Sequence, residues 1–177
     1  MNKKNTIRQD LAQKIYDVLN DDGNFAWYFR KKFTIPFDSA SETQFAAFSH
    51  IFYFDDKVNS AYFDNAFEIV DEICKQENLK INKLHRIYAN LYLNVHHDEK
   101  MKENEIHFDS ENPNCKTILY YVNDSDGNTL FYNDDKVVIN EVKPKKGKYV
   151  IFESSKLHGA GIPVKSKFRM VLNVVFE

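Results

Sequence analysis

The spacing of apolar residues predicts two helices in the first half of the chain. Within residues 6–20, apolar side chains recur every three or four positions, which is the period of an amphipathic helix. Thr6 is a candidate N-cap, and the polar run at residues 21–24 is expected to end this helix. Residues 62–79 show the same helical period and predict a second amphipathic helix.

The segments between these helices have a less regular pattern. Residues 25–37 are rich in aromatic side chains and contain Pro36, so we expect an irregular or extended segment there. Residues 41–48 predict a short helix or turn. The aromatic runs at 27–29 and 52–54 are candidates for a substrate mouth, although packing in the core is the favoured interpretation.

From Arg86 onward the pattern changes to the alternation of strands. Strands are predicted at residues 86–94, 117–123, 129–132, 136–142, 148–153 and 168–176. Turn signals rich in Asp, Asn, Gly and Pro separate most of them. This arrangement predicts a mainly β protein, in which a double-stranded β-helix (jelly roll) is flanked by N-terminal helices.

Length and composition limit the alternatives. The 177 residues fit a single domain, with residues 1–85 as helical and irregular support and residues 86–177 as the jelly-roll core. The formal net charge of −2 gives no reason to expect nucleic-acid binding. Cys74 and Cys115 do not suggest a disulfide framework, and we find no signal peptide or membrane span, so a cytoplasmic location is expected.

The segment His107-Phe108-Asp109 is the main candidate for metal chemistry. In an extended strand, residues two apart point to the same side with Cα atoms roughly 6.6 Å apart, so both side chains can reach one ion. His158 is the candidate third ligand. Two histidines and one carboxylate form the facial triad of non-haem iron(II) oxygenases, which leaves positions open for oxygen and a co-substrate.

A second segment, His96-His97-Asp98, has the same His-x-Asp spacing and competes for this role. The residues after His158 favour the first candidate. Arg169 lies in an otherwise apolar predicted strand, where an unpaired charge would be costly. Its planar guanidinium matches a carboxylate, and it is therefore a candidate for holding 2-oxoglutarate.

Further segments follow the metal motif in a fixed order. Residues 117–123 (TILYYVN) would form the next core strand, residues 127–131 (GNTLF) a glycine-led hairpin strand, and residues 144–152 (PKKGKYVIF) the strand leading to His158-Gly159. In this order and spacing, residues 106–176 resemble the prolyl-hydroxylase-like branch of the iron(II)- and 2-oxoglutarate-dependent oxygenases. The resemblance is closest to compact versions from bacteriophage genomes and to oxygen-sensing prolyl hydroxylases. It places His96, His97 and Asp98 too early for the metal site, in a surface loop.

The resemblance implies further roles. Tyr121 matches a tyrosine that binds the 2-oxoglutarate carboxylate, and Leu119 would line the same pocket. Asn173 falls at a position that is often a hydroxyl residue in the family. Either Asn90 or Tyr92 would supply a second co-substrate contact. The implied cofactors are Fe(II), 2-oxoglutarate and O₂, with ascorbate as a candidate reductant.

The implied reaction is hydroxylation coupled to the conversion of 2-oxoglutarate to succinate. A prolyl or other residue in a protein is the first expected substrate, a free amino acid or another small molecule is second, and a nucleobase is the least favoured. Two alternatives remain from the residues themselves. One is a jelly-roll binding or structural protein with a vestigial metal site, and the other is a cupin-like metal dioxygenase that does not use 2-oxoglutarate.

Overall fold

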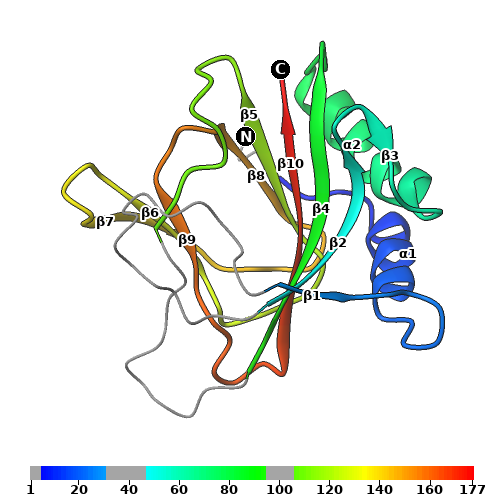
Figure 1. The fold of residues 1–177 in the computed structure, drawn as a ribbon. Helices are drawn as coiled ribbons and strands as arrows, with labels where there is room; N and C mark the ends of the chain where they lie inside the picture. Colours follow the sequence, from blue (N-terminus) through cyan, green and yellow to red (C-terminus); the bar gives the residue numbers. More distant parts are fainter. Residues whose placement is uncertain (1–4, 31–46, 95–105) are drawn as a thin grey trace.

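The computed structural model describes residues 5–30, 47–94 and 106–177, which form two β-sheets with two helices on one side (Figure 1). The helices are α1 (Gln9–Leu19) and α2 (Phe63–Glu77). The strands are β1 (Tyr28–Arg30), β2 (Ala47–Phe54), β3 (Lys57–Val58), β4 (Leu84–Leu93), β5 (Lys116–Tyr121), β6 (Thr129–Tyr132), β7 (Val138–Val142), β8 (Tyr149–Glu153), β9 (His158–Ala160) and β10 (Phe168–Phe176). The prediction of a mainly β, double-stranded β-helix fold with N-terminal helices is confirmed.

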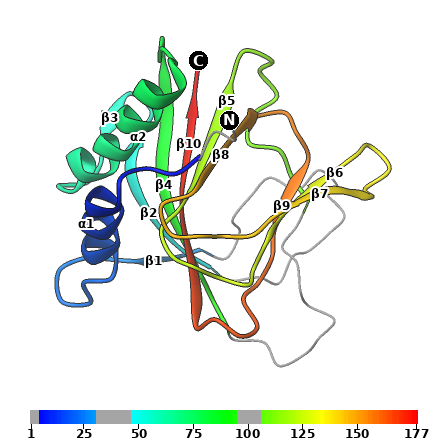
Figure 2. The ribbon, with the colours of Figure 1, turned by 180° about the vertical axis from the view of Figure 1, so that it is seen from behind.

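All the strand pairs are antiparallel. The major sheet has the order β1-β2-β4-β10-β5-β8, and β3 pairs with the outer side of β2. The minor sheet has the order β7-β6-β9. Seen from opposite sides, the two helices lie on one side of the major sheet and the minor sheet lies on the other (Figures 1 and 2).

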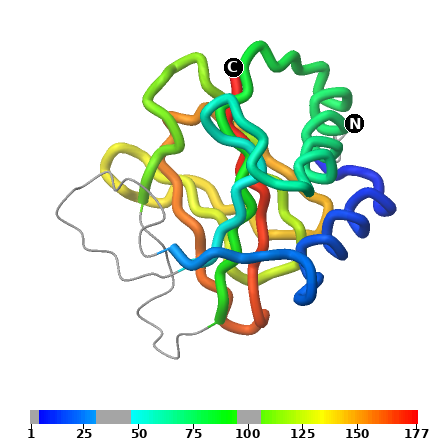
Figure 3. The backbone as a smooth tube through the Cα atoms, turned by 45° about the vertical axis from the view of Figure 1, so that its right-hand side comes forward, coloured from blue at the N-terminus to red at the C-terminus, as the bar shows by residue number. Residues whose placement is uncertain are grey.

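The larger core lies between the major sheet and the helices. Ile15 and Leu19 of α1 and Ile69 and Ile73 of α2 are almost fully buried there, against inward residues of the central strands. The helices also contact each other (Figure 3). Lys14 of α1 forms an exposed ion pair with Glu68 of α2 at 2.6 Å. A smaller apolar cluster, which includes Leu119, lies between the two sheets.

Both predicted helices are present, with small corrections at their ends. Thr6 is not an N-cap, because α1 begins at Gln9 and Thr6 instead forms a β-bridge with Lys148. After α1, the Asp21 carboxylate accepts hydrogen bonds from the backbone of Gly23 and Asn24, which explains why the chain turns there. Asn78 ends α2 in the left-handed conformation, with a φ of 53°.

The six predicted strands correspond to β4, β5, β6, β7, β8 and β10, but four other strands were not predicted. The prediction of a helix or turn at 41–48 is wrong for Ala47 and Phe48, which begin β2; residues 41–46 lie outside the described residues. Strand β1 lies within residues 25–37, which were predicted to be irregular or extended, and residues 31–37 are not described. Strand β3 has only two residues and β9 only three.

The aromatic runs divide between the core and the surface. Phe52 is fully buried beneath the helices, and Trp27 packs against the same core. By contrast, Tyr28, Phe29 and Phe54 are about half exposed, with relative exposures of 59%, 56% and 49%. Core packing therefore applies to Phe52 and Trp27, whereas a substrate mouth formed by the exposed residues stays a prediction.

Candidate functional site

A cavity of about 820 Å³ opens on the face of the major sheet that is turned away from the helices. Its wall is built from alternate residues of neighbouring strands, because every second side chain of a strand points to the same face. Strand β4 contributes Arg86, Tyr88, Asn90 and Tyr92, and strand β10 contributes Arg169, Val171 and Asn173. The intervening residues of both strands point into the core beneath the helices.

His107, Asp109 and His158 meet in this cavity. One nitrogen or oxygen atom from each side chain lies within 4.8 Å of the others, as expected for ligands of one ion. The backbone fixes the two histidines, since His107 and His158 exchange both hydrogen bonds of an antiparallel bridge at 2.9 Å each. Asp109 is held by its backbone N–H, which donates to the carbonyl of Ser154 at 2.8 Å.

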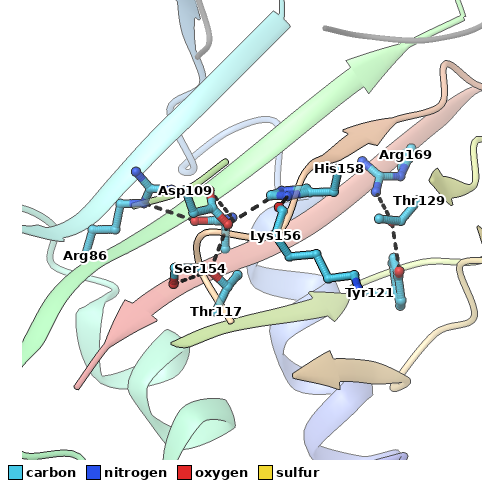
Figure 4. Close-up of polar contacts among 10 residues, drawn as sticks. Arg86, Asp109, Thr117, Tyr121, Thr129, Ser154, Lys156, His158 and Arg169 are labelled. Carbon is cyan, nitrogen blue, oxygen red and sulfur yellow. Dashed lines mark hydrogen bonds and ion pairs between the residues drawn. The ribbon is translucent and has the colours of Figure 1, made fainter. Parts of the chain in front are cut away.

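The side chain of Asp109 accepts hydrogen bonds from three neighbours (Figure 4). Arg86 forms an ion pair with Oδ1, and Thr117 Oγ1 donates to Oδ2 at 2.8 Å. Asn173 Nδ2 lies 3.2 Å from Oδ1 and 3.1 Å from Oδ2. Burial raises the pKa of the carboxyl, but the neighbouring His158 and Arg86 side chains outweigh burial and hold the pKa below its usual value. Asp109 is therefore an ionised ligand candidate with a fixed orientation.

The imidazole of His158 is also oriented. Its Nδ1 donates to the backbone carbonyl of Lys156 at 2.9 Å, and its Nε2 lies 3.6 Å from Asp109 Oδ2. A histidine whose Nδ1 carries the proton presents a lone pair on Nε2, which is the form that binds a metal.

Arg169 lies at the other end of the cavity from Arg86 (Figure 4). Only 1% of the residue is exposed. Its Nη2 donates to Thr129 Oγ1 at 2.9 Å, and the hydroxyl of Tyr121 donates to the same oxygen at 2.8 Å. Its Nε and Nη1 have no hydrogen-bond acceptor among the described residues. A buried cation in this condition is costly unless a ligand completes its bonding.

The other predicted site residues take the following places. Leu119 lines the cavity, and Asn90 lines it with a buried amide oxygen that lacks a partner among the described residues. Tyr121 is fully buried behind Thr129, so its hydroxyl reaches the cavity wall only through that residue. Asn173 lies beside Asp109, at a distance from Arg169. The competing residues 96–98 lie outside the described part of the chain.

Three residues of the site were not predicted from the sequence. Arg86 and Thr117 contact Asp109, and Thr129 joins Arg169 to Tyr121. The alternation within β4 and β5 carried a usable signal, because Arg86 precedes Asn90 by four residues and Thr117 precedes Leu119 by two. The role of Thr129 depends on a contact between two sheets, which strand periodicity does not reveal.

A family model described as the 2OG-Fe(II) oxygenase superfamily matches residues 82–177. A search of curated protein sequences finds no match. In the part of the chain that the structure describes, no helix has the length and apolar character to cross a membrane.

Several solved structures share the fold. A Pseudomonas putida prolyl-4-hydroxylase is 14% identical, with a TM-score of 0.60 over 99% of this chain and 90% of that one. A Trichoplax adhaerens prolyl hydroxylase in complex with a hypoxia inducible factor peptide fragment is 15% identical, with a TM-score of 0.64 over 98% and 80%. The alpha ketoglutarate dependent epimerase SnoN from nogalamycin biosynthesis is 12% identical, with a TM-score of 0.63 over 98% and 75%.

Proposed function

Because the chain belongs to the 2OG-Fe(II) oxygenase superfamily, we propose that it is a hydroxylase whose Fe(II) is held by His107, Asp109 and His158 and whose 2-oxoglutarate is held by Arg169. Enzymes of this superfamily use Fe(II), 2-oxoglutarate and O₂. The observation that carries the assignment is that one cavity holds both a three-ligand cluster and a buried arginine with unused donors.

The donor set fits iron(II). Two imidazoles and one carboxylate are the facial arrangement of non-haem iron enzymes, and they leave three positions of an octahedral ion for other ligands. Arg86 forms its ion pair with Oδ1 of Asp109, whereas Oδ2 lies 3.6 Å from Nε2 of His158, which favours a carboxylate that binds the metal through Oδ2 alone. The hydrogen bond from Nδ1 of His158 to the Lys156 carbonyl orients the ring and leaves Nε2 to bind the metal.

The surroundings of Arg169 fit a dicarboxylate. The unused donors of the guanidinium would pair with the carboxylate of 2-oxoglutarate that lies far from the metal. Thr129 adds a donor, because its oxygen already accepts from Arg169 and Tyr121 and its own hydrogen remains to be donated. Leu119 would pack against the carbon chain of the ligand, as its position in the cavity wall allows.

With 2-oxoglutarate bound, Fe(II) would activate O₂, which is the oxidant; one oxygen atom would enter a substrate C–H bond and the other would enter succinate as 2-oxoglutarate loses CO₂. The residues of this chain bind and orient the reactants. Arg169 and Thr129 fix the far end of the co-substrate, while the metal ligands face the end of the cavity near Arg86 and Phe54. The substrate would enter at that end, since the opposite end is closed by the buried pair Tyr121 and Thr129.

For the substrate we propose a prolyl or other residue in a protein, ahead of a free amino acid. The half-exposed aromatic side chain of Phe54 on the cavity wall suits contact with an extended peptide. The shared fold with a hydroxylase solved with a peptide is consistent with this choice. We also propose a cytoplasmic location, with which two free cysteines are consistent.

The test is to prepare the protein without oxygen, add Fe(II) and 2-oxoglutarate, and record the visible charge-transfer band of the iron–keto acid chelate. The band is expected in the wild type and should disappear in His158→Ala. In Arg169→Ala, it should require much more 2-oxoglutarate. Arg30→Ala is the matched control, because Arg30 lines the cavity without touching Arg169 or the metal ligands.

Two results would contradict the proposal in different ways. Bound iron without a 2-oxoglutarate-dependent band would favour a metal dioxygenase of the cupin type. A protein that binds no iron would instead be a jelly-roll binding protein with a vestigial site.

A further inference from the structure

A second cluster of metal-binding side chains lies at the end of the major sheet, outside the site described above. His85 belongs to β4, Cys115 immediately precedes β5, and Glu177 immediately follows β10. Their ligand atoms lie within 4.8 Å of one another. Strand β10 lies between β4 and β5, so three segments far apart in the sequence converge at one end of these strands.

A β-bulge turns His85 toward its two partners. In the pairing of β4 with β10, Val175 lies opposite Arg86 and Phe176 lies opposite Leu84, so His85 is the extra residue. Regular alternation would place His85 on the helix side together with Ile87. The bulge places Leu84 there instead, against the core, and leaves His85 on the other face. Bulges that redirect a side chain in this way are common next to functional sites.

The distances are those of ligands around one ion. His85 Nε2 lies 2.9 Å and Cys115 Sγ lies 3.8 Å from Glu177 Oε1. For a tetrahedral zinc ion, the usual bond lengths place nitrogen and oxygen ligands roughly 3.3 Å apart and sulfur and oxygen ligands roughly 3.6 Å apart. Both contacts of Glu177 therefore lie within a few tenths of an ångström of the distances around a zinc ion, and the third pair, His85 and Cys115, lies within 4.8 Å.

We propose that His85, Cys115 and Glu177 form a second metal site, for a zinc-like divalent cation. Thiolate, imidazole and carboxylate suit Zn²⁺ or Co²⁺ and do not suit Mg²⁺ or Ca²⁺. Asn112 Nδ2 donates to Glu177 Oε1 at 2.8 Å and orients the carboxylate. Binding of the cation displaces the thiol proton of Cys115 to solvent, so the site fills more readily as pH rises.

The site is accessible and is connected to the cavity. The side chains of His85 and Glu177 are about one-third exposed, at 29% and 30%, while Cys115 is buried. Asn112 links the two regions, because it contacts Glu177 and also lines the cavity. A bound ion would fix the ends of β4, β5 and β10 together and would hold the segment that leads from Asp109 to β5.

The experiment uses Co²⁺ as the probe on the full chain. Sulfur bound to Co²⁺ gives an intense near-ultraviolet charge-transfer band, whereas the His107, Asp109 and His158 centre has no sulfur ligand. We expect this band in the wild type and in the double variant His107→Ala, Asp109→Ala. We expect it to be lost in Cys115→Ser and strongly weakened in His85→Ala. Cys74→Ser is the matched control, because Cys74 lies in α2 on the helix side of the sheet.

A second measurement distinguishes loss of metal binding from a folding defect. Zn²⁺ should raise the melting temperature of the His107→Ala, Asp109→Ala protein, and the further change Cys115→Ser should remove that rise while leaving the circular dichroism spectrum unchanged. The proposal is overturned if no sulfur–cobalt band appears or if the band depends on Cys74. It is also overturned if Zn²⁺ stabilises both proteins equally. None of these results bears on the proposed oxygenase function.

Discussion

Arg86 forms an ion pair with Asp109 through Oδ1, and the same guanidinium donates to Asn173 Oδ1 at 3.1 Å. The hydrogen bond between Arg86 and Asn173 joins neighbouring strands, since Arg86 belongs to β4 and Asn173 to β10. The arginine thus fixes a carboxylate proposed to bind iron, and it does so from the side of the cavity where substrate would enter.

Replacing Arg86 with Gln should weaken Fe(II) binding by roughly tenfold, the lower end of the range for outer-shell partners of metal ligands. The cause is loss of orientation at Asp109 together with a rise in its pKa. Anaerobic titration with Fe(II) would measure the effect. Arg30→Gln is the control, because that arginine shares the cavity but contacts Ser49. Equal affinities for the wild type and Arg86→Gln would show that the ion pair does not position Asp109.

Substitutions of two buried threonines should affect metal binding and co-substrate binding separately. Thr129→Val removes the acceptor shared by Arg169 and Tyr121, so the KM for 2-oxoglutarate should rise by roughly tenfold, as expected for the loss of about 1–2 kcal/mol of hydrogen bonding. Thr117→Val removes a donor to Asp109 and should instead weaken Fe(II) binding. Succinate formation measured against each ligand concentration would distinguish them. The assignment fails if both variants change the same constant.

Stability and function should conflict at Arg169. Without 2-oxoglutarate, its guanidinium is buried with unused donors, so Arg169→Met should raise the free energy of unfolding by about 1 kcal/mol. Arg86→Met should lower that free energy, because it leaves Asp109 without its ion pair. Urea denaturation of the metal-free proteins would test both signs. Adding 2-oxoglutarate with a redox-inert metal should stabilise the wild type and leave Arg169→Met unchanged.

Asp126 should make the stability depend on pH in the acid range. Its carboxylate accepts backbone hydrogen bonds from Val164, Lys165 and Ser166. Burial opposes these bonds, but together they lower the pKa of Asp126 to about 2. A carboxyl whose pKa is lower in the folded than in the unfolded chain stabilises the fold above about pH 4. That contribution is lost as pH falls toward 2.

The corresponding variant is Asp126→Asn. It should be less stable than the wild type at pH 6, and the difference should shrink as the pH is lowered from about 4 to 2. Asp135→Asn, in the turn between β6 and β7, is the control and should give no such trend. If Asp126→Asn destabilised the protein equally at every pH, the negative charge of Asp126 would not contribute to holding residues 164–166.

The sequence predicted most of the strands because their alternation is regular. Strand β10 was predicted at its observed bounds, since its apolar run is long and Arg169 interrupts it on one face only. Strand β2 was missed because its pattern is disturbed by a register shift next to Phe52 and by the buried polar residues Ser49 and His50. Strand β9 has only three residues, which is too few for a period to show.

The candidate site could be predicted only in part. His107, Asp109 and His158, which the structure brings together in one cavity, were singled out because a spacing of two on a strand is visible in one segment, and family motifs supplied the distant partner. Thr129 was missed because its importance arises from two residues that reach it from another sheet. Asn173 was assigned to the co-substrate, whereas the structure places it beside Asp109. The position of a residue along a strand predicts which face of the sheet its side chain lies on, but it does not predict which side chains from other strands it contacts.

Strands β4 and β10 carry the core on one face and the site on the other, with adjacent residues assigned to different tasks. Changes of side chain on the cavity face can therefore alter what is bound while the packing under the helices is preserved, which gives the protein room to acquire new specificities. Insertion or deletion of one residue has the opposite effect. Either change in β10 would turn Arg169 toward the helices and Leu172 toward the cavity, so fold and activity would be lost in a single event. Natural variation in these strands should accordingly consist of substitutions, with changes of length confined to the loops.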